Sequence, residues 1–307
     1  MAIGIDTSFW TTTYWSATAN KYMYGADFDK IQDEAFQFII PRASGGNALD
    51  PGFYGTMDDI APRPWYKGAY HFFDPRINAL VQANMFANAL KNYKLEIPPV
   101  LDLEADYGLS NTVVINAATT FVNEAEALLG RKLMIYTGPW WFDTHMYTVR
   151  LGIKVWPAWC ANHDLWISNP YSGKPTIPKA FKTWVLWQYT FQISYPGLLG
   201  AADGNKFNGT DAQFYAKYGP IPPPPVPVKT GKVLVNNLNI RTGPGQTYMI
   251  TGQKNYGDIV TIYETRVIGS LTWVKIYNSS TAELWCCSMY YGTLYIDVKQ
   301  SVASLVI

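Results

Sequence analysis

The stretch Pro98-Pro99-Val100-Leu101-Asp102-Leu103-Glu104-Ala105-Asp106 has the pattern of a buried β-strand that carries two carboxylates on one face. Side chains alternate along a strand, so Asp102 and Glu104 point one way while Leu101 and Leu103 point the other. Same-face neighbours lie roughly 7 Å apart, close enough for each carboxylate to perturb the pKa of the other. The pair is typical of a site with chemical work to do, although solvated acids at an ordinary strand end share the pattern.

The composition limits the classes of function. The chain has 307 residues, enough for one large domain and a small one. Only 15% of the residues are charged and the formal net charge is +1, so there is no basic surface for nucleic acid or an anionic membrane. Aromatic residues make up 16%, which favours an aromatic-lined groove of the kind that binds carbohydrate. A Trp-rich core is the alternative.

The cysteines and the N-terminus bear on the compartment. Cys160 and the adjacent pair Cys286-Cys287 are too few for a disulfide framework. Residues 1–6 enter a strand pattern directly, without the regions of a signal peptide, and no run of 18 apolar residues exists to span a membrane. We therefore expect synthesis in the cytoplasm without a signal peptide, and action on an external target only after release or delivery.

Strand and helix patterns alternate over the first part of the chain. Strands are expected at residues 3–8, 36–40, 66–73, 99–104, 133–137, 155–162, 183–190 and, as a short one, 202–205; residues 41–46 have the composition of a turn. Helical periodicity occurs at 77–90 and 114–128, with Gly130 placed to end the second helix. About eight strands within roughly 215 residues favour a closed, largely parallel α/β barrel with an incomplete helical layer.

A proline-rich segment separates this region from a second one. Residues 219–230 contain consecutive prolines, which favour a semi-rigid polyproline II linker between the first domain, 1–218, and the rest. Residues 231–298 consist of short β runs and tight turns, the pattern of a small all-β barrel. The apolar tail 299–307 has no assigned role.

Several acids are expected at one end of the barrel. The C-terminal ends of parallel barrel strands meet at one mouth, where catalytic groups come from different strands. Asp6 ends the first strand, Asp102 and Glu104 end the fourth, and Asp203 lies in the short last one. Four acids at one rim favour a catalytic site over an incidental pair. Other polar side chains expected at this rim are Tyr70, Tyr136 and Gln188.

The competing types of site are weakly supported. The three histidines, His71, His145 and His163, lack the spacing of metal ligands. The segment that begins at Asp203 resembles a calcium loop only faintly, because its glycine is one place late and Phe214 stands where a glutamate is needed. We expect no metal and no other cofactor.

An ordered set of short motifs resembles a known family. The motifs are Gly4-Ile5-Asp6-Thr7-Ser8-Phe9-Trp10, Gly68-Ala69-Tyr70-His71-Phe72, Pro99-Val100-Leu101-Asp102-Leu103-Glu104, Ile135-Tyr136-Thr137, Trp187-Gln188-Tyr189 and the segment 203–209. Together they resemble the family 25 glycoside hydrolases, the Chalaropsis-type lysozymes, over roughly residues 1 to 217. The resemblance implies an irregular (β/α)5(β)3 TIM-like barrel that hydrolyses the β-1,4 bond between N-acetylmuramic acid and N-acetylglucosamine in peptidoglycan.

The resemblance also implies roles for the acids. Glu104 would be the general acid and base, and Asp102 would orient the acetamido group of the substrate or restrain Glu104. Asp6 and Asp203 would tune the charge around them. A same-strand pair fits a substrate-assisted reaction with net retention better than a second-carboxylate nucleophile. The residues implied in substrate binding are Tyr70, Tyr136, Gln188, Trp187, Trp10 and Arg42.

Residues 231–298 resemble a bacterial SH3 domain, on motifs such as Leu238-Asn239-Ile240-Arg241-Thr242-Gly243-Pro244 and Trp273-Val274-Lys275. Such domains commonly bind cell-wall peptides, which implies a stem peptide or cross-bridge as the ligand; a spacer, or a module for a protein partner, is the alternative. The whole chain then has the organisation of an endolysin or another wall-lytic enzyme. A catalytically silent wall-binding protein and a chitinase-like hydrolase of N-acetylglucosamine polymers are the alternatives.

Overall fold

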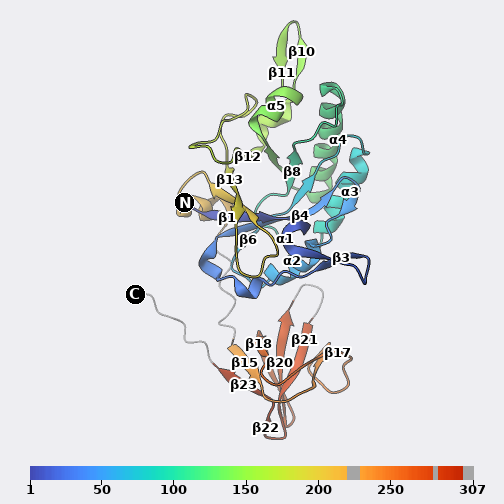
Figure 1. The fold of residues 1–307 in the computed structure, drawn as a ribbon, viewed down its shortest axis with the longest axis vertical. Helices are drawn as coiled ribbons and strands as arrows, with labels where there is room; N and C mark the ends of the chain where they lie inside the picture. The colour runs from blue at the N-terminus through green and yellow to red at the C-terminus, as the bar shows by residue number, and fades with distance from the viewer. Residues whose placement is uncertain (220–228, 279–282, 300–307) are drawn as a thin grey trace. The chain divides into compact units, whose positions relative to one another are not determined.

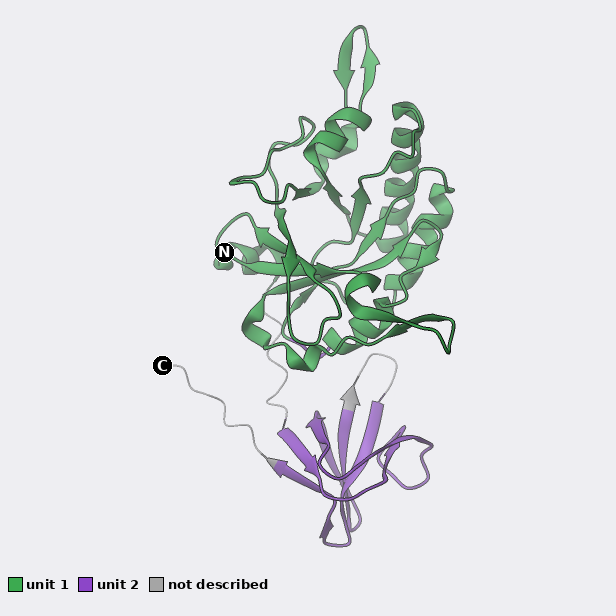
Figure 2. Cartoon of the chain, in the orientation of Figure 1, with its two compact units in different colours: residues 1–60, 64–222 green, residues 61–63, 223–307 purple. Residues whose placement is uncertain are grey.

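The computed structural model describes residues 1–219, 229–278 and 283–299. Most of the expected linker, residues 220–228, and nearly all of the apolar tail, residues 300–307, lie outside the described residues. The chain forms two compact units, one made of residues 1–60 and 64–222 and the other of residues 61–63 and 223–307 (Figure 2). In the described part, no helix has the length and apolar character needed to cross a membrane.

The first unit is a closed barrel of eight strands (Figure 1). The order around the barrel is β1 (Ile3–Thr7), β14 (Ala202–Phe207), β13 (Leu186–Ile193), β12 (Asp164–Ser168), β9 (Met134–Thr137), β8 (Val100–Leu103), β7 (Tyr70–Phe72) and β4 (Phe38–Gly45). Pairing of β4 with β1 closes the barrel. The short strands β5 (Ala48–Leu49) and β6 (Tyr66–Lys67) also pair with β4. Because β14 runs antiparallel to both of its neighbours, the barrel is mixed rather than wholly parallel.

Helices cover the barrel unevenly. They are α1 (Phe9–Thr12), α2 (Phe53–Ile60), α3 (Ala79–Leu90), α4 (Asn111–Leu129), α5 (Pro139–His145) and α6 (Asp211–Tyr218), with 3-10 turns at Phe28–Lys30, Asp33–Ala35 and Ala158–Asn162. The longest, α4, buries an apolar face that includes Val114 and Phe121. Gly130 ends it in the left-handed region, φ 63°, and donates its N–H to the Glu126 carbonyl, as its sequence position predicts.

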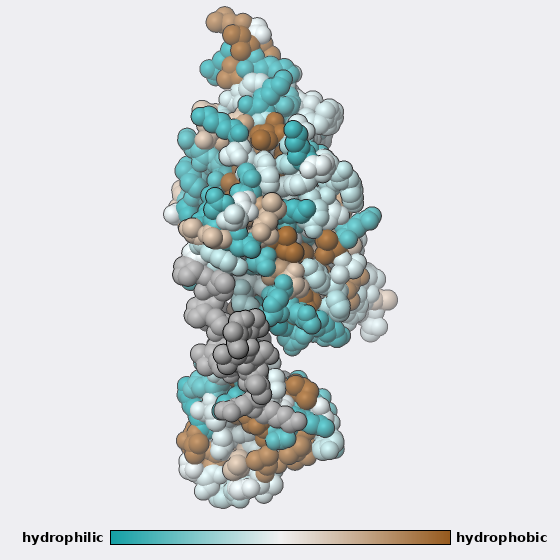
Figure 3. Space-filling model, turned by 90° about the vertical axis from the view of Figure 1, so that its left-hand side faces the viewer, coloured by the Kyte–Doolittle hydropathy of each residue, from teal (hydrophilic) through white to brown (hydrophobic). Residues whose placement is uncertain are grey.

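Two β-hairpins extend from the barrel unit, β2 (Thr13–Ser16) with β3 (Lys21–Tyr24), and β10 (Thr148–Arg150) with β11 (Ile153–Val155). The second hairpin exposes apolar side chains, and its hydrophobic tip is visible at the top of Figure 3. Leu151 and Ile153 are among them.

Strand alternation separates two apolar layers. On β8, Leu101 and Leu103 pack between the sheet and the helices, whereas Val100 packs inside the barrel. Asp102 therefore points into the barrel, as the alternation predicts. The barrel interior is apolar around Met134 and Leu186, and it becomes polar towards the C-terminal ends of the strands.

Three local expectations need correction. Residues 41–45 belong to strand β4 rather than to a turn, and the turn begins only at Gly46. Residues 66–73 form two short strands, β6 and β7, rather than one. Residues 155–162 are not a barrel strand: Pro157 lacks the N–H that a central strand must donate, and a 3-10 turn follows it. The strand is β12, whose Leu165, Trp166 and Ile167 are buried.

The second unit is a small all-β domain, as expected. Its strands are β15 (Lys229–Val233), β16 (Leu238–Arg241), β17 (Ile250–Lys254), β18 (Ile259–Ile262), β19 (Glu264–Ile268), β20 (Leu271–Asn278), β21 (Glu283–Tyr290), β22 (Thr293–Leu294) and β23 (Ile296–Lys299). They form one sheet in the order β18-β15-β23 and another in the order β17-β16-β21-β20-β19. Val233, Val260 and Val274 lie in the core between them.

Candidate active site

The four acids identified in the sequence lie together at the mouth of the barrel. Asp6 on β1 is directly opposite Asp203 on the antiparallel strand β14. Asp102 is the last acid within β8, all of which is buried, and Glu104 follows directly after the end of that strand. Each of the four carboxylates has a resolved electrostatic interaction with at least one of the others. The mouth therefore concentrates four acids that come from three strands.

The side-chain amide of Gln188 holds two of these acids. Its Nε2 donates to Asp6 Oδ2 at 3.0 Å and to Asp203 Oδ2 at 3.1 Å. Its Oε1 accepts from the Tyr136 hydroxyl and from Ser168 Oγ, both at 2.8 Å. All four hydrogen-bonding positions of the amide are used, and only 2% of the residue is exposed. Gln188 therefore positions the acids, and it has no free group for a sugar.

A second amide completes the arrangement around Asp6. Asn205 donates its Nδ2 to Asp6 Oδ2 at 2.7 Å, and its Oδ1 accepts from Trp166 Nε1 at 2.7 Å. Sequence reasoning quoted Asn205 in a motif but assigned it no role, and it did not find Ser168. The signal for Asn205 was present, because it lies two residues after Asp203 on the same strand, as Glu104 lies two residues after Asp102.

Burial raises the pKa of all four carboxyls, and repulsion from a neighbouring acid adds to the shift at Asp6, Asp102 and Glu104. Burial is the main cause at Asp6, where the charges of Asp203 and Glu104 add to it, and at Asp102, where Glu104 and Asp6 add to it. Burial raises the pKa of Asp203 to about 6. Desolvation, followed by the charge of Asp203, also raises the pKa of Glu104. The mouth thus favours protonated carboxyls.

Glu104 and Asp102 differ in their access to solvent. Glu104 is exposed, yet protein surrounds its carboxyl at the concave mouth, which explains why desolvation still raises its pKa. Asp102 is only 4% exposed, and within the described residues its Oδ1 has no hydrogen-bond partner. A reachable carboxyl with a raised pKa can donate a proton, and a buried carboxyl oxygen without a partner can accept a hydrogen bond from a ligand.

A groove opens near the C-terminal ends of several barrel strands, and the four acids are not among the residues that line it. It has a volume of about 560 Å³. Phe72 connects it to the acids, since Phe72 on β7 is opposite Asp102 on β8. The groove is lined by side chains that follow the C-terminal ends of β1, β4, β7 and β8, among them Phe9, Arg42, Asp50, Asp74, Arg76 and Tyr107.

Comparison with known proteins assigns the first unit to a family. The model of glycosyl hydrolases family 25 matches residues 15–198, and the bacterial SH3 domain model matches residues 236–291. The chain belongs to glycosyl hydrolase family 25. It is a glycoside hydrolase, so the family expected from its motifs is confirmed, and the first unit has the expected closed α/β barrel of eight strands.

Named relatives agree with this family. Lysozyme M1 of Streptomyces globisporus is 29% identical over 69% of this chain and 70% of its own length. The N,O-diacetylmuramidase of Arthroderma benhamiae is 27% identical over 64% of this chain and 84% of its own. The crystal structure of a bacterial lysozyme from Streptomyces coelicolor has a TM-score of 0.57 at 26% identity and covers 71% of this chain and 96% of its own.

The other residues implied in substrate binding do not all lie at the mouth of this family 25 hydrolase. Tyr70 and Tyr136 lie inside the barrel beside Trp166, with ring centroids 6.3 and 4.8 Å from it. Trp10 is 68% exposed. Trp187 lies on the opposite face of β13 from Gln188, in the apolar layer between sheet and helices, and so does not line the mouth.

Arg42 is held at the edge of the groove. Its Nε donates to Asp50 Oδ2 at 2.7 Å, and its guanidinium lies 4.9 Å from the centroid of the Phe9 ring. Its charge partly offsets the raised pKa of Asp102. In the described ranges no group of three or more His, Cys, Asp and Glu side chains is arranged to hold a metal ion.

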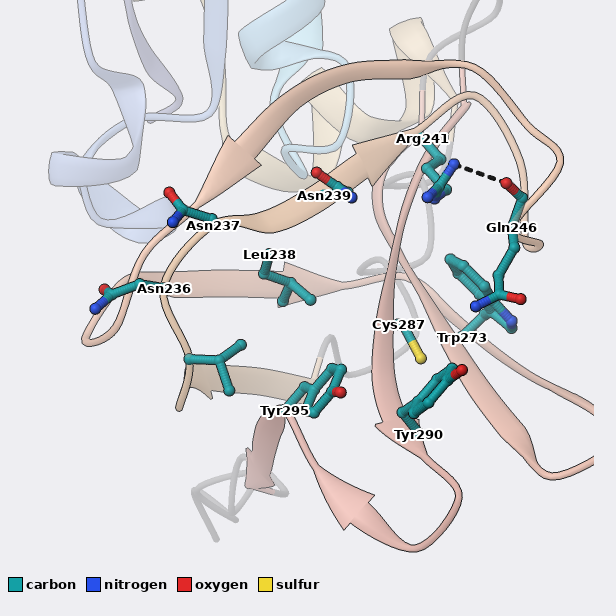
Figure 4. A pocket seen from close by; sticks show the side chains of 11 residues that line it. Asn236, Asn237, Leu238, Asn239, Arg241, Gln246, Trp273, Cys287, Tyr290 and Tyr295 are labelled. Carbon is teal, nitrogen blue, oxygen red and sulfur yellow. Dashed lines mark hydrogen bonds between the residues drawn. The ribbon is translucent and has the colours of Figure 1, made fainter.

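A separate cavity of about 410 Å³ lies within the small domain (Figure 4). Tyr290 and Tyr295 stack there with ring centroids 6.0 Å apart. Arg241 donates Nη1 to the carbonyls of Gln246 and Tyr248. The side chains that line this cavity include one cation and no carboxylate; besides those named they are Val235, Asn236, Asn237, Leu238, Asn239, Trp273 and Cys287.

The raised pKa of Asp203 predicts a stability effect. The Asp203 carboxyl holds its proton more tightly in the folded state than in the unfolded chain. Its contribution to the free energy of unfolding is therefore complete below about pH 4 and is lost as the pH rises through about 6. Asp203→Asn removes the disfavoured charge. We expect its melting temperature at pH 7 to exceed that of the wild type by about 2–4 °C, and the two proteins to melt alike at pH 4.

Thermal unfolding followed by circular dichroism at both pH values measures this effect. Glu34→Gln, a change at an exposed acid away from the mouth, serves as the control and should not alter the pH dependence. A lower melting temperature for Asp203→Asn at pH 7 would contradict this prediction, because it would show that the charged carboxylate of Asp203 stabilises the fold.

Proposed function

We propose that this family 25 hydrolase is a muramidase that cleaves the β-1,4 bond between N-acetylmuramic acid and N-acetylglucosamine in bacterial peptidoglycan. The observation that carries the proposal is Glu104, a solvent-reachable carboxyl with a raised pKa that lies beside three more deeply buried acids. Relatives named lysozyme and N,O-diacetylmuramidase support the choice of substrate. The barrel that carries the site is an irregular (β/α)5(β)3 barrel in this proposal.

Glu104 acts first as an acid and then as a base. Its proton passes to the glycosidic oxygen as the bond from that oxygen to C1 breaks, so the leaving sugar departs as a neutral alcohol. The Glu104 carboxylate then takes a proton from the water that attacks C1, which restores the acid. The charge of Asp203 helps to keep the Glu104 carboxyl protonated at the start, and Asp6 tunes the charge of the mouth through its own interaction with Glu104.

Asp102 orients the group that attacks. Its unpartnered Oδ1 accepts the N–H of the substrate acetamido group, whose carbonyl oxygen then bonds to C1 as the leaving group departs. Attack by water at C1 opens the resulting ring. Two inversions at C1 give net retention, and the reaction needs no carboxylate nucleophile. The buried environment of Asp102 strengthens its hydrogen bond to the substrate.

Glu104→Gln tests the catalytic assignment. The amide cannot deliver the proton, so we expect the release of reducing ends from purified peptidoglycan to fall by at least about 10²-fold, with the fold retained. The assay is run beside Glu34→Gln, which should release reducing ends like the wild type. Unchanged turnover by Glu104→Gln would remove the assignment.

The same assay separates the alternatives. A wild-type protein that binds peptidoglycan and releases no reducing ends would be a silent wall-binding protein. Faster release from chitin than from peptidoglycan would identify a chitinase-like enzyme. The pH dependence adds a further check. Glu104 must be protonated to act, so we expect activity to fall at high pH, and its raised pKa should extend activity towards neutral pH.

For the small domain, with the boundaries 231–298, we propose binding of a wall peptide, either a stem peptide or a cross-bridge. The cavity supports this because its polar groups are mainly donors. Asn236 and Asn239 already use their Oδ1 atoms, as acceptors from Tyr256 N and Gln253 Nε2, so their Nδ2 groups remain to donate. Carbonyl and carboxylate oxygens of a peptide match these donors and Arg241.

In this proposal the barrel spans residues 1–218 and the linker residues 219–230, so the domain tethers the enzyme to its substrate. The protein acts as an endolysin or another wall-lytic enzyme, made in the cytoplasm and active after release or delivery.

Asn239→Asp tests the peptide site. The change keeps the size and the acceptor oxygen, and it adds a negative charge to a cavity without carboxylates. We expect about fivefold to tenfold weaker cosedimentation with purified sacculi, measured in the Glu104→Gln background to prevent digestion. Asn123→Asp makes the same charge change on an exposed position of α4 and should bind as the parent does. Equal binding by both variants would contradict the assignment.

A further inference from the structure

A row of four aromatic side chains extends from the groove onto the β2–β3 hairpin. In spatial order they are Trp10, Phe9, Tyr22 and Trp15, and we call them the aromatic strip. The ring centroids of Phe9 lie 4.1 Å from Trp10 and 5.0 Å from Tyr22, and Tyr22 lies 5.2 Å from Trp15. Exposure reaches 68% for Trp10, 53% for Trp15 and 37% for Tyr22. Three of the four rings are therefore exposed, and Phe9 connects Trp10 to the other two.

A chain of contacts connects the strip to the acids at the mouth. Phe9 lies two residues after the end of β1, the strand that carries Asp6. The Phe9 N–H donates to Asp50 Oδ2 at 3.1 Å, and the same oxygen accepts from Arg42. Arg42 lies over the Phe9 ring and interacts electrostatically with Asp102. Phe9 also lines the groove, so the strip continues the groove outward.

The hairpin that carries the far end of the strip is anchored to the barrel unit. Thr13 Oγ1 donates to the Phe9 carbonyl at 2.7 Å, and the Tyr24 hydroxyl donates to Asp59 Oδ2 at 2.6 Å. Trp15 and Tyr22 are directly opposite each other on the two strands. Anchoring at the base holds both rings in place, although their exposed surfaces do not contribute to the core.

The chemistry of the strip matches sugar rings. A pyranose has an apolar face of C–H groups and a polar edge of hydroxyls, so it can stack on an aromatic face while its hydroxyls bond to polar atoms nearby. The strip carries no charge of its own, and neither Trp15 Nε1 nor the Tyr22 hydroxyl has a hydrogen-bond partner among the described residues. An isolated apolar partner would leave these two polar atoms unsatisfied.

We propose that the aromatic strip binds the glycan strand of the substrate beyond the groove, and so makes this enzyme prefer long strands. The inference rests on the proposed muramidase function and adds distal sugar sites to it. Continuity with the groove identifies the occupant, because a strand whose cleaved bond lies at Glu104 must leave the mouth along its surface. The strip contributes binding energy remote from the reacting atoms, which lowers KM for long strands.

The test compares long and short substrates in the full-length protein. Trp15→Ala is assayed on long glycan strands stripped of peptides and on a tetrasaccharide of two disaccharide repeats. We expect the ratio of kcat/KM for long strands to that for the tetrasaccharide to fall about fivefold to tenfold, through a higher KM for the long strands. Trp15→Phe keeps an aromatic face and should recover most of the ratio.

Tyr54→Ala is the matched control, since Tyr54 is 45% exposed on α2 and stacks against Tyr93 rather than against the strip. An unchanged ratio in Trp15→Ala, or an equal fall for both substrates, would overturn the proposal. So would unchanged glycan binding together with altered self-association in sedimentation, because the strip would then contact a second copy of the chain.

A binding assay without turnover separates failure of the muramidase proposal from failure of the aromatic-strip proposal. The affinity of Glu104→Gln for long strands is compared with that of Glu104→Gln combined with Trp15→Ala. Weaker binding by the double variant supports the strip even if the wild type cleaves neither substrate, in which case only the muramidase proposal fails. Equal affinity of the two proteins for long strands overturns the strip.

Discussion

The opposed carboxylates of Asp6 and Asp203 set the arrangement of the mouth. They are direct neighbours on antiparallel strands; burial raises the pKa of both, and the charge of Asp203 adds to the shift at Asp6. One amide, Gln188, donates to both acids, while Asn205 supplies a further donor to Asp6. Because Ser168 and Tyr136 hold the carbonyl end of Gln188, the acids are tied to three more barrel strands. Burial thus makes both carboxyls hold a proton more tightly than exposed carboxyls do.

Solvation divides the work between the other two acids. Asp102 and Glu104 are two residues apart, but Asp102 faces into the barrel while Glu104 lies just past the end of β8. The difference follows from where the strand ends. A proton donor must meet the substrate and exchange with water, which suits the exposed Glu104. A hydrogen-bond acceptor that must hold a fixed position works best when it is shielded from water on a rigid strand, which suits Asp102.

Features with a strict local period were predictable from the sequence, and features that depend on distant partners were not. Alternation placed Asp102 on the inner face of β8, and the ordered motifs identified the family. The prediction of a strand at residues 155–162 was wrong: their apolar composition suits a strand, but Pro157 prevents strand pairing. The amide of Gln188 was expected to hold sugar, since nothing local reveals that its four bonding positions are filled from four other strands.

The aromatic excess that first suggested a carbohydrate groove has more than one cause. Trp65, Trp166 and Trp285 are fully buried, so part of the excess is core, as the alternative held. The exposed part is not scattered: Trp10, Tyr22 and Trp15 are linked through Phe9 to the arginine beside the acids at the mouth. Single exposed aromatic residues need no explanation, but a contiguous row that begins at an active site does. The same barrel thus has a mouth of four acids with raised pKa values and, beside it, an uncharged aromatic surface that fits the proposed glycan strand.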